Sequence, residues 1–144
     1  MRYTGTMIYW NADLAEKIAC TRQEMDTLPS HIDHLIELAK TIDQSGIQPS
    51  VNQFSSEKDA FLRYGLRLMG EGFAGEILEE ILAVLLYVSG AKGLEFLRQC
   101  IDAEALLSIA NGEDKDTLTR KLLPYCGIDT ALISYEKRNQ NHAD

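Results

Sequence analysis

The histidines are the residues through which this sequence most directly suggests chemistry. His31 and His34 stand three positions apart and are accompanied by Asp33 and Glu37. On a helix, residues at this spacing lie on one face, so the two imidazoles could share a metal ion. Two ligands do not complete a metal site, and the third histidine, His142, lies close to the C-terminus. The alternative interpretation is the exposed start of a helix, and we predict no bound metal.

A second group of charges lies in the segment GEDKD, residues 112–116. A Ca²⁺ ion needs six to eight oxygen ligands, which the EF-hand loop places at fixed alternating positions around a central glycine. That spacing is absent here. We expect Gly112 to end one helix in the left-handed conformation, and Asp114 or Asp116 to cap the next helix. Acids at that place also complement the helix dipole.

Other possible sites have simpler explanations. Glu76, Glu79 and Glu80 open a predicted helix, where the dipole explains acidic residues without catalysis. The stretch GEGFAG, residues 70–75, follows a predicted helix rather than a strand and precedes no lysine, so it does not predict nucleotide binding. We therefore predict no catalytic residue and no cofactor.

The cysteines are few and far apart. Cys20, Cys100 and Cys126 form no CxxC motif, and their number is odd. This pattern disfavours a disulfide framework and a zinc site, and it indicates structural thiols in a reducing cytoplasm.

The composition is that of an ordinary globular domain. The chain has 144 residues, of which 45% are hydrophobic and 25% are charged, and its net charge is −8. Phosphate contacts need lysine and arginine, so this acidic chain is predicted not to bind nucleic acid. The longest apolar run, residues 81–88, is far shorter than the about 20 residues of a membrane span. We predict a cytoplasmic protein without membrane insertion and without a signal peptide.

Apolar positions recur at helical spacing between glycine stops, and this pattern predicts an all-α bundle of about five to seven helices. One helical domain spans residues 1–136, and the polar segment 137–144 is predicted to be a frayed tail. Residues 46–58 are predicted to be the longest loop, after which Ser56 and Asp59 could form a capping box. Helices are expected over residues 13–25, 30–45, 59–69, 77–88, 94–109, 118–123 and 128–136.

A weak internal repeat appears when the chain is shifted by 40 residues. Each unit reads as a helix, a glycine turn and a second helix, which suggests two packed α-hairpins in the C-terminal half. A periodic pattern around a shared glycine also produces such matches by chance, so both interpretations stay open. The matched positions are Leu66 with Leu106, Met69 with Ile109, the turn glycines Gly72 and Gly112, Glu76 with Asp116, Leu78 with Leu118, and Leu82 with Leu122.

Three stretches in order resemble the cytoplasmic parts of the flagellar motor stator A subunit, of the MotA/PomA type. They are LIELAKTIDQSGI at 35–47, DAFLRYGLRLMGEGFAGEILEEIL at 59–82 and LRQCIDAEALLSIANGEDKDTLTRKLLPYC at 97–126. The resemblance covers about half of the chain. The transmembrane helices of that family have no counterpart here, and its rotor-facing arginine and glutamate correspond to Asp43 and Val51.

The resemblance implies a cytoplasmic, non-enzymatic helical module that contacts a protein partner. Surface charges near the second stretch would then mediate binding. The residues that we expect to contribute are Arg63, Arg67, Glu71, Glu79 and Glu80.

Two alternatives remain from the residues themselves. A homodimer could form on the stripe at residues 77–88, which is apolar on more than one face and therefore predicts either a central core helix or an interface. A small metal-binding enzyme could be centred on His31, Asp33 and His34. The aromatic N-terminus, with Tyr3, Tyr9 and Trp10, could pack on the core or form an interface patch.

Overall fold

The chain is helical throughout the part that this computed structural model describes, residues 12–47 and 55–143, and no strand occurs there. Seven of the described α-helices have six or more residues, which confirms the predicted all-α bundle of five to seven helices. The aromatic N-terminus and most of the predicted 46–58 loop lie outside the described residues. The elements are α1 (Ala12–Lys17), α2 (Arg22–Met25), α3 (Leu28–Ser45), α5 (Ala60–Gly70), α6 (Gly75–Tyr87), α7 (Leu94–Ala110), α8 (Lys115–Leu122), the 3-10 helix η2 (Leu123–Cys126) and α9 (Ile128–Ala143).

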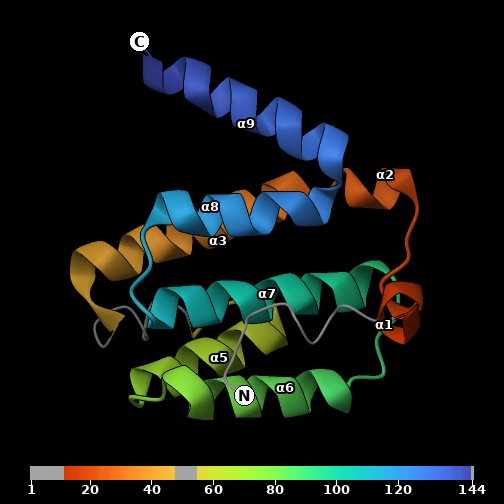
Figure 1. Cartoon of the computed structure of the whole chain (residues 1–144). Coiled ribbons are helices and arrows are strands. Elements are labelled where there is room, and N and C mark those ends of the chain that lie inside the picture. Colours follow the sequence, from red (N-terminus) through yellow and green to blue (C-terminus); the bar gives the residue numbers. More distant parts are fainter. Residues whose placement is uncertain (1–11, 48–54, 144) are drawn as a thin grey trace.

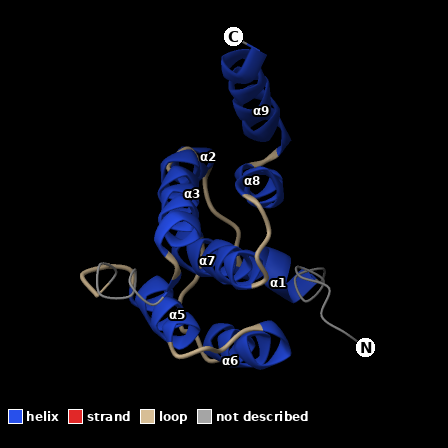
Figure 2. Cartoon of the chain, turned by 90° about the vertical axis from the view of Figure 1, so that its left-hand side faces the viewer, coloured by secondary structure: helices blue, strands red, loops and turns tan. Residues whose placement is uncertain are grey.

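Helix α7 lies at the centre of the bundle (Figure 1 and Figure 2). Helices α3 and α8 pack on one side of it, and α5 and α6 pack on the other side. Because α7 is covered from both sides, every residue from 100 to 108 is buried, including the polar ones. Helix α9 extends away from these layers after its contact with η2.

Helix α6 lies at the edge of the bundle, so the central-helix interpretation of its apolar stripe is wrong. Leu78, Leu82 and Leu86 are its buried residues, and they recur every four residues along one face. This face packs against α7, which takes the central position instead. Ile81 and Leu85 are partly buried against the core, whereas Ile77, Val84 and Tyr87 are left exposed on the outer side of the helix.

The two turns of the predicted repeat have the same backbone geometry. Gly72 and Gly112 both have positive φ angles, 97° and 76°, and both follow the last turn of a helix. In each turn the residue after the glycine donates its backbone N–H to the carbonyl five residues earlier, at 3.1 Å. This is the helix-ending motif expected for a glycine in the left-handed conformation. The matched leucines Leu78 and Leu118 are both buried, as are Leu82 and Leu122.

Several helix starts differ from those predicted. Asp59 caps α5 itself by accepting a hydrogen bond from the Leu62 backbone N–H at 3.2 Å, so the capping box proposed with Ser56 is wrong. Helix α3 begins at Leu28, two residues before Ser30, because Pro29 is tolerated in a first helical turn.

The first predicted helix is divided into α1 and α2. Thr21 and Glu24 form a capping box, in which each side chain accepts a hydrogen bond from the other residue's backbone N–H. At the other end of the chain, α9 continues to Ala143, so the segment predicted to be a frayed tail from residue 137 continues this helix.

Helices α5 and α7 approach closely at Gly65. A Cβ atom at this position would lie 2.3 Å from Cδ1 of Leu106, whose side chain is fully buried. The absence of a side chain at Gly65 therefore allows Leu106 to fill the space between the two helices.

We predict that Gly65→Ala destabilises the protein by about 1 kcal/mol. Overpacking a core costs about 1–3 kcal/mol, and the better helix propensity of alanine offsets about 1 kcal/mol of this. Urea denaturation of wild type and variant measures the change. In a Leu106→Ala background the clash is gone, so the same substitution should stabilise the variant. A loss of stability in both backgrounds would contradict this account of the contact.

Candidate functional site

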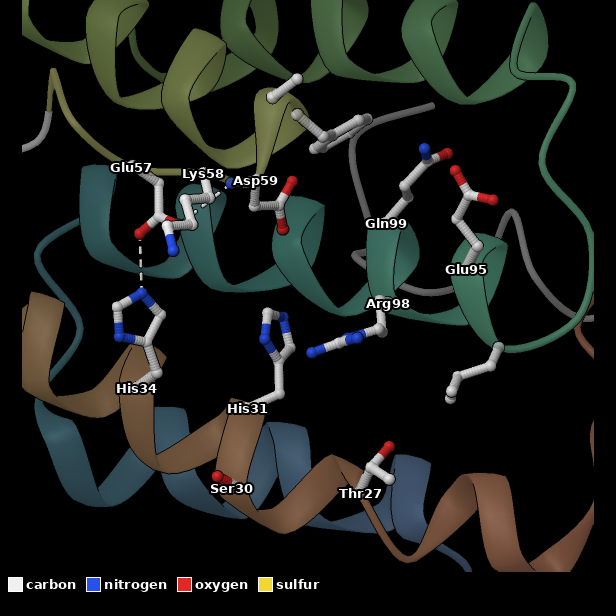
Figure 3. Close-up of a pocket in the computed structure, with 13 residues that line it drawn as sticks. Thr27, Ser30, His31, His34, Glu57, Lys58, Asp59, Glu95, Arg98 and Gln99 are labelled. Carbon is white, nitrogen blue, oxygen red and sulfur yellow. Dashed lines mark hydrogen bonds and ion pairs between the residues drawn. The ribbon is translucent and has the colours of Figure 1, made fainter.

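A cleft of about 970 Å³ opens between α3, the start of α5 and the first half of α7 (Figure 3). Each of these elements contributes polar side chains to its wall. Prominent among them are Thr27, His31, His34, Glu57, Asp59 and Arg98.

His31 lies in the second turn of α3 and points toward α7. Its side chain is buried, and its Nε2 lies 2.6 Å from Oδ1 of Asp102 on α7. The interpretation of this segment as an exposed helix start is therefore wrong for His31. It holds for His34, which is half exposed and whose Nε2 lies 2.7 Å from Oε1 of Glu57.

The two histidines thus line one cleft, but each has its own carboxylate partner. Asp33 is exposed and does not line the cleft with them. The predicted cluster of His31, Asp33 and His34 is therefore not brought together. Instead, ligand-type atoms of His31, Asp59 and Asp102 all lie within 4.8 Å of one another.

Asp59 has two roles at once. Its carboxylate caps the N-terminus of α5, and it also faces the cluster at the wall of the cleft. Glu57 supports this position, because its Oε2 accepts a hydrogen bond from the Asp59 backbone N–H at 3.1 Å. The start of α5 and the cluster therefore share one carboxylate.

Asp102 is completely buried in the middle of α7. Its Oδ1 meets His31, whereas its Oδ2 has no hydrogen-bond partner among the described residues. A buried polar atom without a partner costs about 1–3 kcal/mol of stability. Most buried polar atoms in proteins have a hydrogen-bond partner, so the unpaired Oδ2 of Asp102 needs a physical explanation.

The cluster perturbs the ionisation of its members. Burial, followed by the positive charge of Arg98, lowers the pKa of His31 to about 4, although Asp59 and Glu57 oppose this shift. Burial raises the pKa of Asp102 well above its ordinary value, and the neighbouring Asp59 raises it further. Partial burial alone would raise the pKa of Asp59, but its contact with Asp102 and its cap hydrogen bond give a net lowering. At neutral pH His31 is thus uncharged and Asp59 is ionised.

The sequence pattern indicates His31 but not its two partners. It predicts Asp59 only as an acid in a capping box, and no pattern points to Asp102. Asp102 and Glu104 are the two charged residues in the largely apolar segment from Cys100 to Leu107. Their presence there becomes informative only once this part of α7 is known to be buried on all sides.

The residues predicted to bind a partner lie on the layer formed by α5 and α6. Arg63 and Arg67 on α5, Glu71 after it and Glu80 on α6 are exposed, whereas Glu79 is half-buried. Arg63 donates a hydrogen bond to the backbone carbonyl of Glu57, so part of its role is to support the cleft.

The outer face of α6 beside these charges is apolar. Ile77, Val84 and Val88 are 57%, 59% and 69% exposed, and Tyr87 is 89% exposed. Spacings of seven and four residues place the first three on one side of the helix. Exposed apolar groups in such a row are typical of an interaction surface.

The acidic segment at residues 112–116 forms a helix-to-helix turn, as predicted. Asp114 caps α8 by accepting the Thr117 backbone N–H at 2.7 Å. Glu113 accepts hydrogen bonds from Lys121 at 2.6 Å and from the buried hydroxyl of Ser108 at 2.5 Å. The carboxylates of Glu113 and Asp114 thus stabilise the turn between α7 and α8.

The cysteines are free thiols. Burial raises the pKa of Cys100 to about 12 and that of Cys126 to about 11, and both are therefore protonated and unreactive. Cys20 is partly exposed, and burial followed by the charge of Glu24 raises its pKa as well.

Comparisons with known proteins give no match: no protein-family model, curated protein or solved structure is significantly similar to this chain. The resemblance to the flagellar stator subunit therefore stays a prediction. Within the described residues, no helix is long and apolar enough to cross a lipid bilayer.

We predict that His31 makes stability depend on pH. The native pKa of about 4 lies below the ordinary value of 6.5, so the unfolded chain binds a proton between these values that the native chain does not. Stability is present above pH 6.5 and falls on acidification toward pH 4, by up to roughly 3 kcal/mol. The raised pKa of Asp102 acts in the opposite direction, because its contribution is present at low pH and is lost as the pH rises.

Urea denaturation of the Asp102→Asn variant in EDTA, at pH values from 4 to 7, isolates the contribution of His31. The loss of stability on acidification should be steeper in this variant than in wild type. Adding His31→Asn should flatten the profile. An equally steep profile without His31 would contradict the assignment.

Proposed function

We propose that this chain is a non-enzymatic protein-interaction module that self-associates through the outer face of α6. The observation that carries the proposal is the row formed by Ile77, Val84 and Val88, with the almost fully exposed Tyr87 beside it. The opposite face of the same helix packs on α7, so the exposed row sits on a rigid support. Free cysteines are consistent with a role in the reducing cytoplasm.

A second copy of the chain is the occupant that fits this face. In an antiparallel, two-fold pairing of two α6 helices, Ile77 of one copy would meet Val88 of the other, which is the self-complementary arrangement of a closed dimer. The exposed acids Glu76 and Glu80 lie in the N-terminal half of α6, and the exposed Lys92 follows its C-terminal end. The antiparallel pairing would therefore bring acids of each copy toward the lysine of the other.

We predict that Val84→Glu weakens this dimer by more than about tenfold, equivalent to about 1.4 kcal/mol, because the new carboxylate would be buried without a partner. Val84 is 59% exposed, so the fold of the monomer should be retained. Light scattering coupled to size exclusion, over a range of concentrations, measures the dimer dissociation constant.

The matched control is Ile133→Glu on α9, where a side chain of similar exposure, 55%, lies away from this face. This control should dimerise like wild type. A wild-type chain that remains monomeric at high concentration, or a Val84→Glu variant that dimerises unchanged, would contradict the proposal.

A partner of the flagellar rotor type is a second candidate. It is favoured by the exposure of Arg67, Glu71 and Glu80 on the same layer of the molecule, as the family resemblance implies. Such charges act mainly on encounter and register.

For this candidate, Arg67→Glu should reduce capture of flagellar switch proteins by about tenfold at low salt and less at high salt. Pull-down with purified switch proteins measures the effect. Lys115→Glu, an exposed reversal on α8 in the other layer, is the matched control and should have no effect. If wild type captures no switch protein, the motor partner is excluded.

A further inference from the structure

The cluster of His31, Asp59 and Asp102 has the composition and the reach of a metal site. One ring nitrogen and two carboxylate oxygens can approach a common point, because the ligand-type atoms lie within 4.8 Å of one another. The three residues come from α3, the start of α5 and α7, and α7 packs on both of the other helices. Their separation is therefore set by the packing of the core rather than by a flexible loop.

A second, independent observation points to a ligand. Oδ2 of Asp102 is fully buried and has no partner among the described residues, although it belongs to the same cluster. Oδ1 lies 2.6 Å from Nε2 of His31, whereas Oδ2 accepts no hydrogen bond from a described residue, so Oδ2 is the oxygen available to a ligand. Two neighbouring carboxyl groups in a buried place need a positive charge between them. A proton held between Asp102 and Asp59 supplies it when no ion is bound, and a metal cation can take the place of that proton.

We propose that His31, Asp59 and Asp102 bind a first-row transition-metal dication such as Zn²⁺. Two carboxylates neutralise the ion, and an imidazole nitrogen selects it over Ca²⁺, which requires six to eight oxygen ligands. This set also differs from the histidine pair suggested by sequence, because His34 is engaged by Glu57.

The cleft provides the route for the ion and leaves coordination positions open. His31 and Asp59 line the cleft, and Asp102 lies behind them in the core. An ion entering from the cleft would meet three protein ligands and retain exchangeable positions on the outer side, as in metal sites that bind a further ligand. The guanidinium of Arg98, which extends toward His31 in Figure 3, faces these positions and would suit an anionic ligand there.

Arg98 also opposes the ion, because both carry positive charge. Arg98→Gln should therefore keep the site and tighten Zn²⁺ binding several-fold. A cation bound elsewhere on the surface would not respond to Arg98→Gln, so tighter binding by this variant places the ion in the cluster.

Calorimetric titration of the purified, EDTA-treated full chain with ZnCl₂ at pH 7 tests the proposal. Wild type should bind one Zn²⁺ per chain, and Asp102→Asn and Asp59→Asn should each weaken binding by about 100-fold or more. Asparagine is also a good helix cap, so Asp59→Asn keeps the start of α5 and tests the ligand alone. The controls Asp33→Asn and His34→Gln should leave the affinity within about threefold.

Replacement of Zn²⁺ by Co²⁺ provides a readout that a purely structural role would not change. Wild type should show the visible absorption of bound Co²⁺ at one equivalent, and Asp59→Asn should lose it while its circular dichroism stays native. Circular dichroism also checks that Asp102→Asn is folded. Absence of stoichiometric metal binding, or equal metal binding by wild type and Asp59→Asn, would overturn the proposal. The cluster would then be only a polar contact between helices.

Discussion

The burial of residues 100–108 of α7 on every side is the constraint on which the rest of the structure depends. A helix between two layers must present apolar or paired groups in all directions, and the nine buried residues from 100 to 108 meet this demand mainly with leucine, isoleucine, alanine and cysteine. The close approach of α5 at Gly65 and the two equivalent glycine turns arrange the neighbouring helices around it. Asp102 is the member of this set that most needs a partner, and the cleft forms around the residues that approach it.

Much of the helical layout could be predicted from the sequence, because local signals specify it. Glycine stops and leucine periodicity predict α5, α6, α7 and α8, and Gly72 and Gly112 act as the predicted turns. The division near Thr21 was missed, because a capping box inside a plausible helix competes with the continuing pattern. Which helix is central could not be predicted, since periodicity identifies an apolar face but not what covers it. Helix α6 has the longer apolar run, yet α7 is the one that is enclosed.

The site was predictable only in part for the same reason. The spacing of His31 and His34 places both on one side of α3, and both do line the cleft. Their carboxylate partners, however, stand 71 and 23 residues away in the chain. No local pattern relates Asp102 or Glu57 to these histidines. The meeting of His31, Asp59 and Asp102 is a product of packing three helices, and only the folded arrangement exposes it.

The dual role of Asp59 has a consequence for how this protein can change over time. One carboxylate both satisfies the first turn of α5 and belongs to the cluster beside the cleft. Asparagine or serine could replace it as a cap, so the helix tolerates several residues at this position whereas the cluster tolerates fewer. A chain that had lost the chemistry of the cleft could therefore keep its fold intact. If related sequences keep aspartate at this position and do not exchange it for other capping residues, selection has acted on the cleft and not on the helix.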